Sequence, residues 1–392
     1  MAIDLDIIEE LAEDIAAFRQ DLADNPEVGP DVSRTAGKVV EKLQQTSLRV
    51  RDHAGFPEQS AMGVVADLPV WNAERTVALV ADMSAQNVRH DGTSRARSRR
   101  CSHVAGNDAH TAMLVGTALL LHRSDVAHNI RFIWQSGGEM LSDGAQAMIR
   151  DGALTDVDEV YAVHLWPGLE LGKVGLAEGP IMASLDRFYL QVRGQRGLRP
   201  WPHRKIDAIR IGAAIVQELD QLNNGDARVA GGAGALRCVI THFVAEREEE
   251  GAPPDQVTLE GEIRALSDDE RRDAAQRLDA IGKRCAEAHG GSVKLTIRAR
   301  GNITVNAAES VSRVRQRLAR HFREGDIAAV KPSAFSSGLS GYLEQVPGAM
   351  IPLGCGGETS EPASLLLSPS FSFSDRCLVE GMRILAALVG GS

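Results

Sequence analysis

Hydrophobic residues recur every three or four positions in the first segment of the chain, from Asp4 to Leu22. The apolar positions are Leu5, Ile8, Leu11, Ile15, Phe18 and Leu22. This spacing gives an amphipathic helix with one apolar face, which we expect to pack on a core. Two further helices are predicted at 108–122 and 142–151, and Gly152 ends the second of them.

Short apolar runs between these helices have the composition of buried strands. They are Thr76–Val80 (TVALV), Asn129–Trp134 (NIRFIW) and Val160–His164 (VYAVH). Each run is too short for an average helix, and β-branched or aromatic residues are frequent in all three. Strands that alternate with helices at this spacing predict a mostly parallel α/β sheet.

The middle of the chain has a different pattern, in which apolar and polar residues alternate. Ser267 and Glu270 form a capping box at the start of a helix that runs to about Ala288. The other predicted elements, in chain order, are a strand at 186–193, a helix at 206–222, and strands at 236–245, 256–266 and 292–298. The order β-α-β-β-α-β is that of a ferredoxin-like α+β unit.

These patterns together predict two domains in the 392 residues. Residues 1–184 and 300–392 are expected to form an α/β domain with a mostly parallel sheet. Residues 185–299 are expected to form the ferredoxin-like domain, inserted into the first as a lid.

Composition narrows the class of function. With 43% hydrophobic and 24% charged residues, the chain has the composition of a globular protein. The net charge of −10 argues against a binder of nucleic-acid backbones, and the short basic run at 95–100 is interpreted as a solvated loop. No run reaches the roughly 18 apolar residues of a membrane span, and the acidic first segment is unlike a signal peptide, so a cytoplasmic location is expected.

The five cysteines are widely spaced and contain no CxxC pair. Neither a disulfide framework nor a cysteine zinc finger follows from them. Cys101 stands close to His103 and could be a nucleophile, but a cysteine in a loop without a recognised orienting group is more often incidental.

Polar residues follow the predicted strands at the places where ligands bind in α/β sheets. These places lie beyond the carboxyl ends of the strands. The residues there are Asp82, the segment HVAGNDAHT at 103–111, Glu139 and His164. Histidines and carboxylates at several strand ends indicate a metal site or an acid/base site, although caps and turns would use the same residues. Asp108 in particular resembles an N-cap for the helix that follows it.

Several segments, in order along the whole chain, resemble motifs of one group of enzymes. The strongest are ADMSAQN at 81–87, HVAGNDAHTAMLVGTALL at 103–120, WQSGGEM at 134–140, GAQAMIRDGAL at 144–154 and HLWPGLELGKVG at 164–175. FRQDLADNPE, RGLRPWPHRKID, YLEQVPG and LLLSPSFSFSD add to them. The chain is similar to the aminoacylase, hippurate hydrolase and auxin-conjugate amidohydrolase group of dinuclear zinc metallopeptidases. The resemblance implies the two-domain arrangement above, with a homodimer formed through the insert.

The resemblance also implies a set of metal ligands, and most of these residues are replaced here. The ligand positions fall on Ala105, Asn107, Glu139, His164 and Leu367, of which only Glu139 and His164 keep the residue of the family. Alanine and leucine side chains offer no lone pair, and an amide is a poor zinc ligand. A catalytic zinc needs about three protein ligands, so we expect no bound cofactor, with zinc or manganese as the exception.

Other positions that the resemblance assigns to chemistry are changed as well. The general base falls on Gly138, and its loss alone costs roughly 10²–10⁴ in rate. An aspartate that supports the metals falls on Ser84, while Asp82 remains. Two positions that contact substrate fall on Leu198 and near Gly251.

Three interpretations remain open for the function. In the first, the chain is a repurposed enzyme that acts on a small amide or on an N-acyl amino acid-like substrate without metal. Its catalytic candidates are His103, Asp108, His110, Glu139 and His164. In the second, the chain is a non-catalytic protein that binds a small ligand or serves as a partner subunit. In the third, one metal ion remains, held by Glu139, His164 and either His103 or His110.

Overall fold

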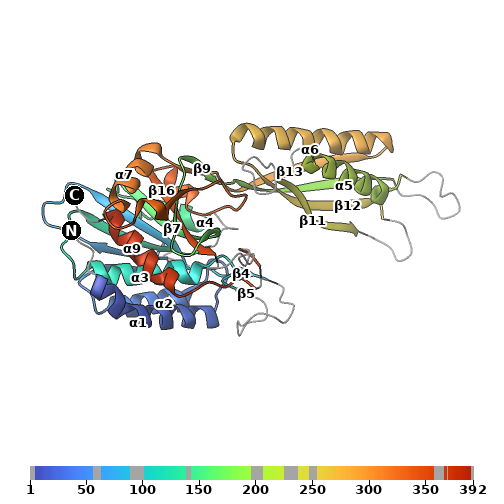
Figure 1. The fold of residues 1–392 in the computed structure, drawn as a ribbon. Helices are drawn as coiled ribbons and strands as arrows, with labels where there is room; N and C mark the ends of the chain where they lie inside the picture. The colour runs from blue at the N-terminus through green and yellow to red at the C-terminus, as the bar shows by residue number, and fades with distance from the viewer. Residues whose placement is uncertain are drawn as a thin grey trace. The chain divides into compact units, whose positions relative to one another are not determined.

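The computed structural model describes residues 5–55, 63–88, 101–137, 143–195, 206–224, 237–246, 254–356, 366–368 and 370–389. The chain forms two compact units (Figure 1). Unit 1 comprises Met1–Gly179, Val305–Val330 and Ser337–Ser392, and unit 2 comprises Pro180–Thr304 and Lys331–Ser336. The expected insert, 185–299, lies within unit 2, whose bounds are wider.

Unit 1 is built on an eight-stranded sheet with the order β1-β2-β6-β3-β7-β16-β8-β15. Its strands are β1 (Arg49–Ala54), β2 (Gly63–Leu68), β3 (Thr76–Asp82), β6 (Asn129–Gln135), β7 (Glu159–Glu170), β8 (Val174–Leu176), β15 (Ile327–Ala329) and β16 (Gly348–Gly356). The central strands β6, β3, β7 and β16 are parallel to one another. The mostly parallel sheet predicted from the sequence is confirmed.

Strand β7 is longer than the predicted 160–164. Its pairing with β16 runs from Val160 opposite Gly348 to Glu170 opposite Gly356. The residues after Leu165 are half-exposed or exposed, so the apolar pattern fades although the strand continues.

Helices cover this sheet. They are α1 (Leu5–Asp24), α2 (Ser33–Leu43), α3 (Asn107–Leu121), α4 (Asp143–Arg150), α7 (Ala308–Leu318), α8 (Ser340–Leu343) and α9 (Arg376–Val389), with a 3₁₀ turn at Glu324–Asp326 and the small strands β4 (Gln86–Asn87) and β5 (Cys101–Ser102). Helix α3 packs between α1, α9 and strand β3 (Figure 1). Every residue of α3 is buried, which fits a sequence that is apolar after its first turn except for Thr111 and Thr117.

Unit 2 has the predicted β-α-β-β-α-β order. Its elements are β10 (Leu185–Arg193), α5 (Ala208–Asn224), β11 (Arg237–Glu246), β12 (Gln256–Arg264), α6 (Asp268–Ala288) and β13 (Ser292–Gly301), and two short strands, β9 (Gly179–Met182) and β14 (Thr304–Asn306), lie at the unit boundary. The antiparallel sheet has the order β11-β12-β10-β13, as in ferredoxin-like folds. Ser267 caps α6 by accepting a hydrogen bond from the N–H of Glu270. The homodimer through this unit stays a prediction.

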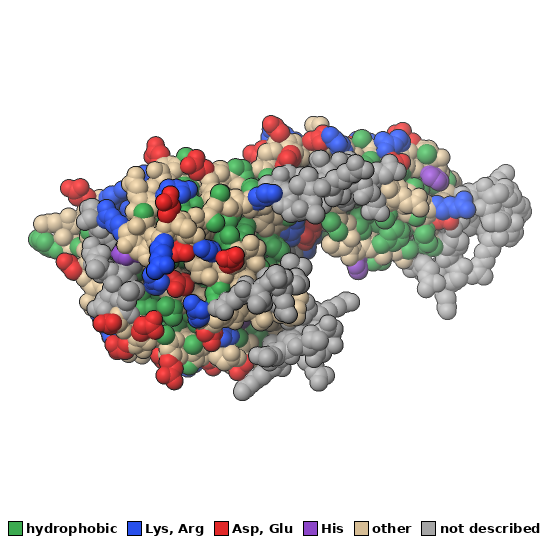
Figure 2. Space-filling view, viewed as in Figure 1, with side chains coloured by type: hydrophobic (Ala, Val, Ile, Leu, Met, Phe, Trp, Pro, Cys, Tyr) green, Lys and Arg blue, Asp and Glu red, His purple; other side chains and the backbone are tan. Residues whose placement is uncertain are grey.

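On the face drawn in Figure 2, the acidic and basic side chains of the described residues are interspersed. None of the helices in the described part of the chain has the length and apolar character needed to cross a membrane.

Candidate active site

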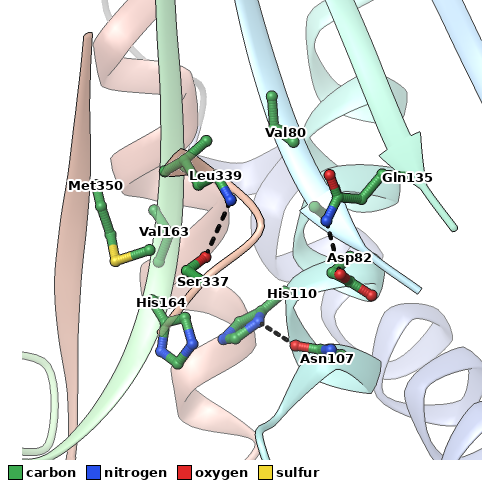
Figure 3. Close-up of a pocket in the computed structure, with 12 residues that line it drawn as sticks. Val80, Asp82, Asn107, His110, Gln135, Val163, His164, Ser337, Leu339 and Met350 are labelled. Carbon is green, nitrogen blue, oxygen red and sulfur yellow. Dashed lines mark hydrogen bonds between the residues drawn. The ribbon is translucent and has the colours of Figure 1, made fainter. Parts of the chain in front are cut away.

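The candidate site lies where the central strands of unit 1 end. Asp82 is the last residue of β3 and Gln135 is the last residue of the neighbouring strand β6, in register with Asp82. His164 belongs to β7, which pairs with β3 on its other side. Figure 3 shows these side chains converging with those of α3. Asp82 and His164, which the strand-end rule selected in the sequence, thus lie at one edge of the sheet.

Gly106 sets the direction in which α3 begins. It is the N-cap residue and has a left-handed backbone with φ of 81°, a conformation that glycine adopts without strain. A Cβ atom at this position would lie 2.9 Å from Cδ1 of Leu165. Glycine is thus required here both for the turn and for the close approach of β7.

The prediction that Asp108 is the N-cap of this helix is wrong. Asp108 lies inside the first turn, and the cap residue Gly106 has no side chain to make a cap bond. The carboxyl group of Asp108 is buried, and its Oδ1 has no hydrogen-bond partner among the described residues. Burial raises the pKa of Asp108 from 3.8 to about 7, although the nearby Arg19 guanidinium favours the charged form.

Asp82 organises the loop that follows β3. One of its carboxylate oxygens accepts from the N–H of Ser84 at 2.8 Å, and the other accepts from Nε2 of Gln135 at 2.7 Å. The carbonyl oxygen of Ser84 in turn accepts from Nδ2 of Asn107 at 2.9 Å. The ends of β3 and β6 are thereby connected to the first turn of α3.

The hydrogen bonds of His110 fix its tautomer. The main-chain N–H of Leu165 donates to Nε2 of His110 at 3.0 Å, so this nitrogen carries no proton. The proton of the neutral ring is then on Nδ1, which donates to Oδ1 of Asn107 at 3.2 Å. Burial, together with neighbouring His164 and His103, lowers the pKa of His110 well below its ordinary value. His110 is therefore neutral, and both of its nitrogens are committed to the protein.

His164 carries its ring proton on the same nitrogen. Its Nδ1 lies 2.9 Å from the carbonyl oxygen of Leu165, which can only accept, so Nδ1 is the donor. In the neutral ring Nε2 is then the unprotonated nitrogen, as it is in His110. The rings of His164 and His110 lie with their centroids 4.5 Å apart.

A cavity of about 30 Å³ lies between these groups. Its polar lining consists of Asp82, Asn107, His110, Gln135, His164 and Ser337, and its apolar lining consists of Val80, Ala81, Ala162, Val163, Leu339 and Met350. Figure 3 shows the polar side chains from β3, β6, β7 and α3 around it. The volume suffices for one or two water-sized groups but not for a whole amino acid.

His103 is the most isolated of the predicted site residues. It is 6% exposed, and neither ring nitrogen has a hydrogen-bond partner among the described residues. Burial lowers the pKa of His103 from 6.5 to about 3, so the ring is neutral at pH 7. Cys101, two residues earlier, donates its thiol hydrogen to the carbonyl oxygen of Pro26 at 3.5 Å.

Leu367 is connected to the same segment by its backbone. Its N–H donates to the carbonyl oxygen of Val104 at 2.8 Å, while its side chain is 37% exposed. Its φ of 65° is the left-handed conformation, which is strained for leucine. The position that the family resemblance assigns to a ligand histidine is thus close in space to the HVAGNDAHT segment.

Not every predicted site residue can be placed. Glu139, Gly138, Leu198 and Gly251 lie outside the described residues. The structure brings together His103, His110 and His164, and it places Asp108 toward Arg19 of α1. Within the described part of the chain, no three or more His, Cys, Asp and Glu side chains are grouped as metal ligands would be.

Sequence reasoning missed two residues that line the cavity, Gln135 and Ser337. Gln135 carried a usable signal, because it is a polar residue at the carboxyl end of a buried strand, as Asp82 is. Ser337 carried none, since it comes from a loop far away in the sequence.

Comparison with known proteins agrees with this architecture. Residues 78–390 match the model of peptidase family M20/M25/M40. An N-acyl-L-amino acid amidohydrolase from Geobacillus stearothermophilus is 34% identical over 290 residues, which cover 73% of this chain and 76% of the relative. An N-acetylcysteine deacetylase from Bacillus subtilis is 24% identical over 93% of this chain and 94% of its own.

The fold is also found in solved structures. The crystal structure of a dinuclear metal binding peptidase of the M20 family from Bacillus subtilis superposes with a TM-score of 0.78. The two chains are 23% identical, and the match covers 97% of this chain and 98% of the other.

Proposed function

This chain belongs to peptidase family M20/M25/M40, and from that premise we propose that it acts on a small amide or N-acyl amino acid without using a bound pair of metal ions. The names of its relatives, an N-acyl-L-amino acid amidohydrolase and an N-acetylcysteine deacetylase, support the substrate class. The residues at the ligand positions support the absence of the metal pair.

The donor set does not fit two metal ions. Ala105 and Leu367 have no donor atom in their side chains. Asn107 has one, but its Oδ1 already accepts from His110 and its Nδ2 donates to the Ser84 carbonyl. The one donor atom left to Asn107, its amide oxygen, already accepts from His110 and is a weaker zinc ligand than the imidazole that the family has at this position.

One observation carries the proposal. A continuous chain of hydrogen bonds runs from Ser84 through Asn107 and His110 to Leu165, next to His164. The protein itself thus holds together the loops that a shared metal ion would otherwise connect. His164 lies beside this chain, with its ring centroid 4.5 Å from that of His110.

His164 can act as a general base on water or on a substrate hydroxyl. This contributes roughly 10²–10⁴ in rate. The buried carboxyl of Asp108, with its pKa near 7, is protonated in a substantial fraction of molecules at neutral pH. Glu139 is the second acid/base candidate by its place in the sequence. We assign His110 and Asn107 to positioning, because their polar atoms are already hydrogen-bonded.

A non-catalytic role is the second candidate. It is favoured by the small cavity and by the commitment of His110 and Asn107 to internal bonds. In this case the same edge of the sheet would bind a small ligand and turn nothing over.

A single metal ion is the third candidate. The observation that favours it is His103, a buried histidine without a partner for either nitrogen among the described residues. Such a side chain could become a ligand together with His164 and Glu139.

One set of measurements separates the three. Purified protein is analysed for metals and then assayed on N-acetyl and N-benzoyl amino acids before and after chelation. Turnover that survives chelation and falls at least hundredfold in His164→Ala supports the proposal. His242→Ala, which alters an exposed histidine of unit 2, is the matched control.

The other outcomes are equally distinct. Near-stoichiometric zinc or manganese, with activity lost on chelation and in His103→Ala, would establish the single-metal enzyme instead. Saturable binding of these compounds without turnover would establish the binding protein.

A further variant tests the reason given for the loss of metal. The combined change Ala105→Cys, Asn107→His, Gly138→Glu and Leu367→His restores the residues of the family. If the fold around these four positions still suits a metal site, this variant gains tight zinc binding that the unaltered chain lacks. Equilibrium dialysis measures the zinc bound by both proteins. Equal zinc binding by both proteins would contradict the proposal.

A further inference from the structure

One face of the sheet in unit 2 carries the core of that unit. Phe188, Leu190 and Leu259 point to this face and pack with residues of α5 and α6, and Figure 1 shows both helices on the same side of the sheet. Successive side chains of a strand point to opposite faces, so the residues between them lie on the second face. On β10 the residues of the second face are Arg187, Tyr189, Gln191 and Arg193.

The part of the second face formed by β10 and β13 is basic. In register with the β10 residues stand Arg298, Thr296, Lys294 and Ser292 of β13. Four of these eight side chains are basic and none is acidic, although the chain as a whole has 53 acidic residues against 43 basic ones. Positive charge is therefore concentrated at this place in an acidic protein.

Two of the arginines stand directly opposite each other. Arg187 pairs in register with Arg298, and the Cβ atoms of such pairs are about 4.5–5.5 Å apart, where like charges destabilise a sheet. Arg187 is half-buried and Arg298 is exposed, and neither forms an ion pair in the part of the chain that the structure describes. An anion bound to this arginine pair would remove the repulsion.

The neighbouring carboxylates do not neutralise the arginine pair. Glu262 stands opposite Arg187 on the other side of β10, but its Oε2 accepts from Nε and Nη2 of Arg264 at 3.3 and 3.0 Å. Glu260 stands opposite Tyr189 instead. Neither carboxylate forms an ion pair with a member of the arginine pair.

Tyr189 orients one member of the pair. The guanidinium carbon of Arg298 lies 5.6 Å from the centroid of the Tyr189 ring. A guanidinium over an aromatic ring keeps its N–H groups available for acceptors, and its forked donors match the oxygens of a phosphate group. Arg298 thus presents oriented donors next to a second guanidinium.

We propose that the arginine pair binds a phosphate dianion, either inorganic phosphate or the phosphate group of a small molecule. A phosphate group carries a charge of about −1.5 to −2 at pH 7 and has three strong acceptor oxygens. It can therefore offset both guanidinium charges, whereas a carboxylate offsets only one. The site lies within unit 2 and its binding requires no turnover, so it does not depend on the proposed function.

The experiment follows the ³¹P NMR signals of inorganic phosphate and of methyl phosphate. Each compound is titrated with the full chain above neutral pH and at constant ionic strength. We expect saturable broadening of the signal that chloride and acetate do not reverse. A response to both compounds assigns the phosphate group of a small molecule, and a response to inorganic phosphate alone assigns the free ion.

Thr296→Asp tests the site without removing an arginine. Thr296 is exposed and lies on the second face, two residues from Arg298, so a carboxylate there competes with phosphate for the arginine pair. The affinity for phosphate should fall about ten- to hundredfold. Thr296→Asn is the matched control, because it has nearly the same shape without the charge, and it should bind as the unaltered chain does.

Arg187→Gln and Arg298→Gln each remove one member of the pair. Both variants should lose phosphate affinity by a similar factor. In phosphate-free buffer of low ionic strength, Arg187→Gln should not lower the melting temperature, because it relieves the repulsion between like charges. Arg210→Gln, at an exposed arginine of α5, controls for a general loss of positive charge.

Three results would overturn the inference. Without saturable broadening by either compound, the arginine pair is no phosphate site. Acetate that competes as well as phosphate does, or an equal loss of affinity in Arg210→Gln, would show unspecific attraction of anions. Undiminished binding in Thr296→Asp and in both glutamine variants of the pair would place the bound phosphate elsewhere.

Discussion

The main-chain N–H of Leu165 donates a hydrogen bond to Nε2 of His110 over 3.0 Å. This bond joins strand β7 to helix α3 and leaves His110 with its proton on Nδ1. His110 therefore supports the site through its hydrogen bonds, although its place in the sequence suggested a catalytic histidine.

His110→Phe should consequently destabilise the protein. The buried N–H of Leu165 would lose its acceptor, and the free energy of unfolding should fall by about 1–3 kcal/mol. Urea denaturation measures this difference. His110→Gln, which offers an acceptor and a donor, should recover part of the loss, and the exposed His242→Phe should change little. A fully stable His110→Phe that has lost activity would show that the ring is catalytic.

Asp108→Asn should stabilise the protein above neutral pH. Burial raises the folded-state pKa of Asp108 above its unfolded value of 3.8, to about 7. The folded state thus binds more protons between these values, and stability falls as the pH rises through this range. Above pH 7 the free energy of unfolding of Asp108→Asn should exceed that of the unaltered chain by on the order of a few kcal/mol. Near pH 4 the two proteins should have the same free energy of unfolding.

Asp269→Asn is the matched control for this measurement. Asp269 occupies the same second position in the first turn of α6 but is exposed. Its substitution repeats the change of charge at a helix start without the burial found at Asp108. Parallel stability curves for Asp108→Asn and the unaltered chain would contradict the raised pKa.

Gly106→Ala and Gly29→Ala separate two costs of replacing a glycine. Both residues have a left-handed backbone, with φ of 81° and 83°. A Cβ at residue 29 would have no neighbour within 4 Å, whereas one at residue 106 would lie 2.9 Å from Leu165. Gly29→Ala should cost about 1–2 kcal/mol from the backbone alone. Gly106→Ala should cost more, and only this variant should impair the site; equal losses would rule out the steric contribution.

Leu367→Asn should relieve backbone strain. Leucine at φ of 65° is unfavourable, while asparagine tolerates this conformation. We expect a gain of about 0.5–1 kcal/mol in the free energy of unfolding. The reciprocal change Asn72→Leu, at an exposed residue with φ of 58°, should lose a similar amount. If both variants lose stability, strain at residue 367 is not the dominant effect.

Burial and periodicity are local signals, and they predicted the β-α-β-β-α-β elements of unit 2 and, in unit 1, α1, β3, α3, β6, α4 and β7. No element was predicted for α2, β1 or β2, or for the part of unit 1 that follows the insert. Strand β3 and helix α6 begin within a residue of their predicted starts, since a buried run and a capping box mark them directly. The start of α3 was misread. The helix begins directly after Gly106, which has a left-handed backbone. The sequence analysis instead placed the start at Asp108, because a carboxylate is a common N-cap side chain.

The site was only partly predictable. The strand-end rule located Asp82 and His164, because topology alone brings these residues to one edge. It could not reveal that Asn107 joins Ser84 to His110, since those contacts depend on side-chain orientation. Nor could it show the tautomers of His110 and His164, because these follow from hydrogen bonds with the backbone of Leu165.

The bond between Leu367 and Val104 uses main-chain atoms only. Any residue other than proline can make it, so evolution can exchange the side chain at this position while the architecture around it persists. The hydrogen bond itself therefore persists when the side chain at residue 367 changes. The same tolerance makes residue 367 a natural entry point for engineering.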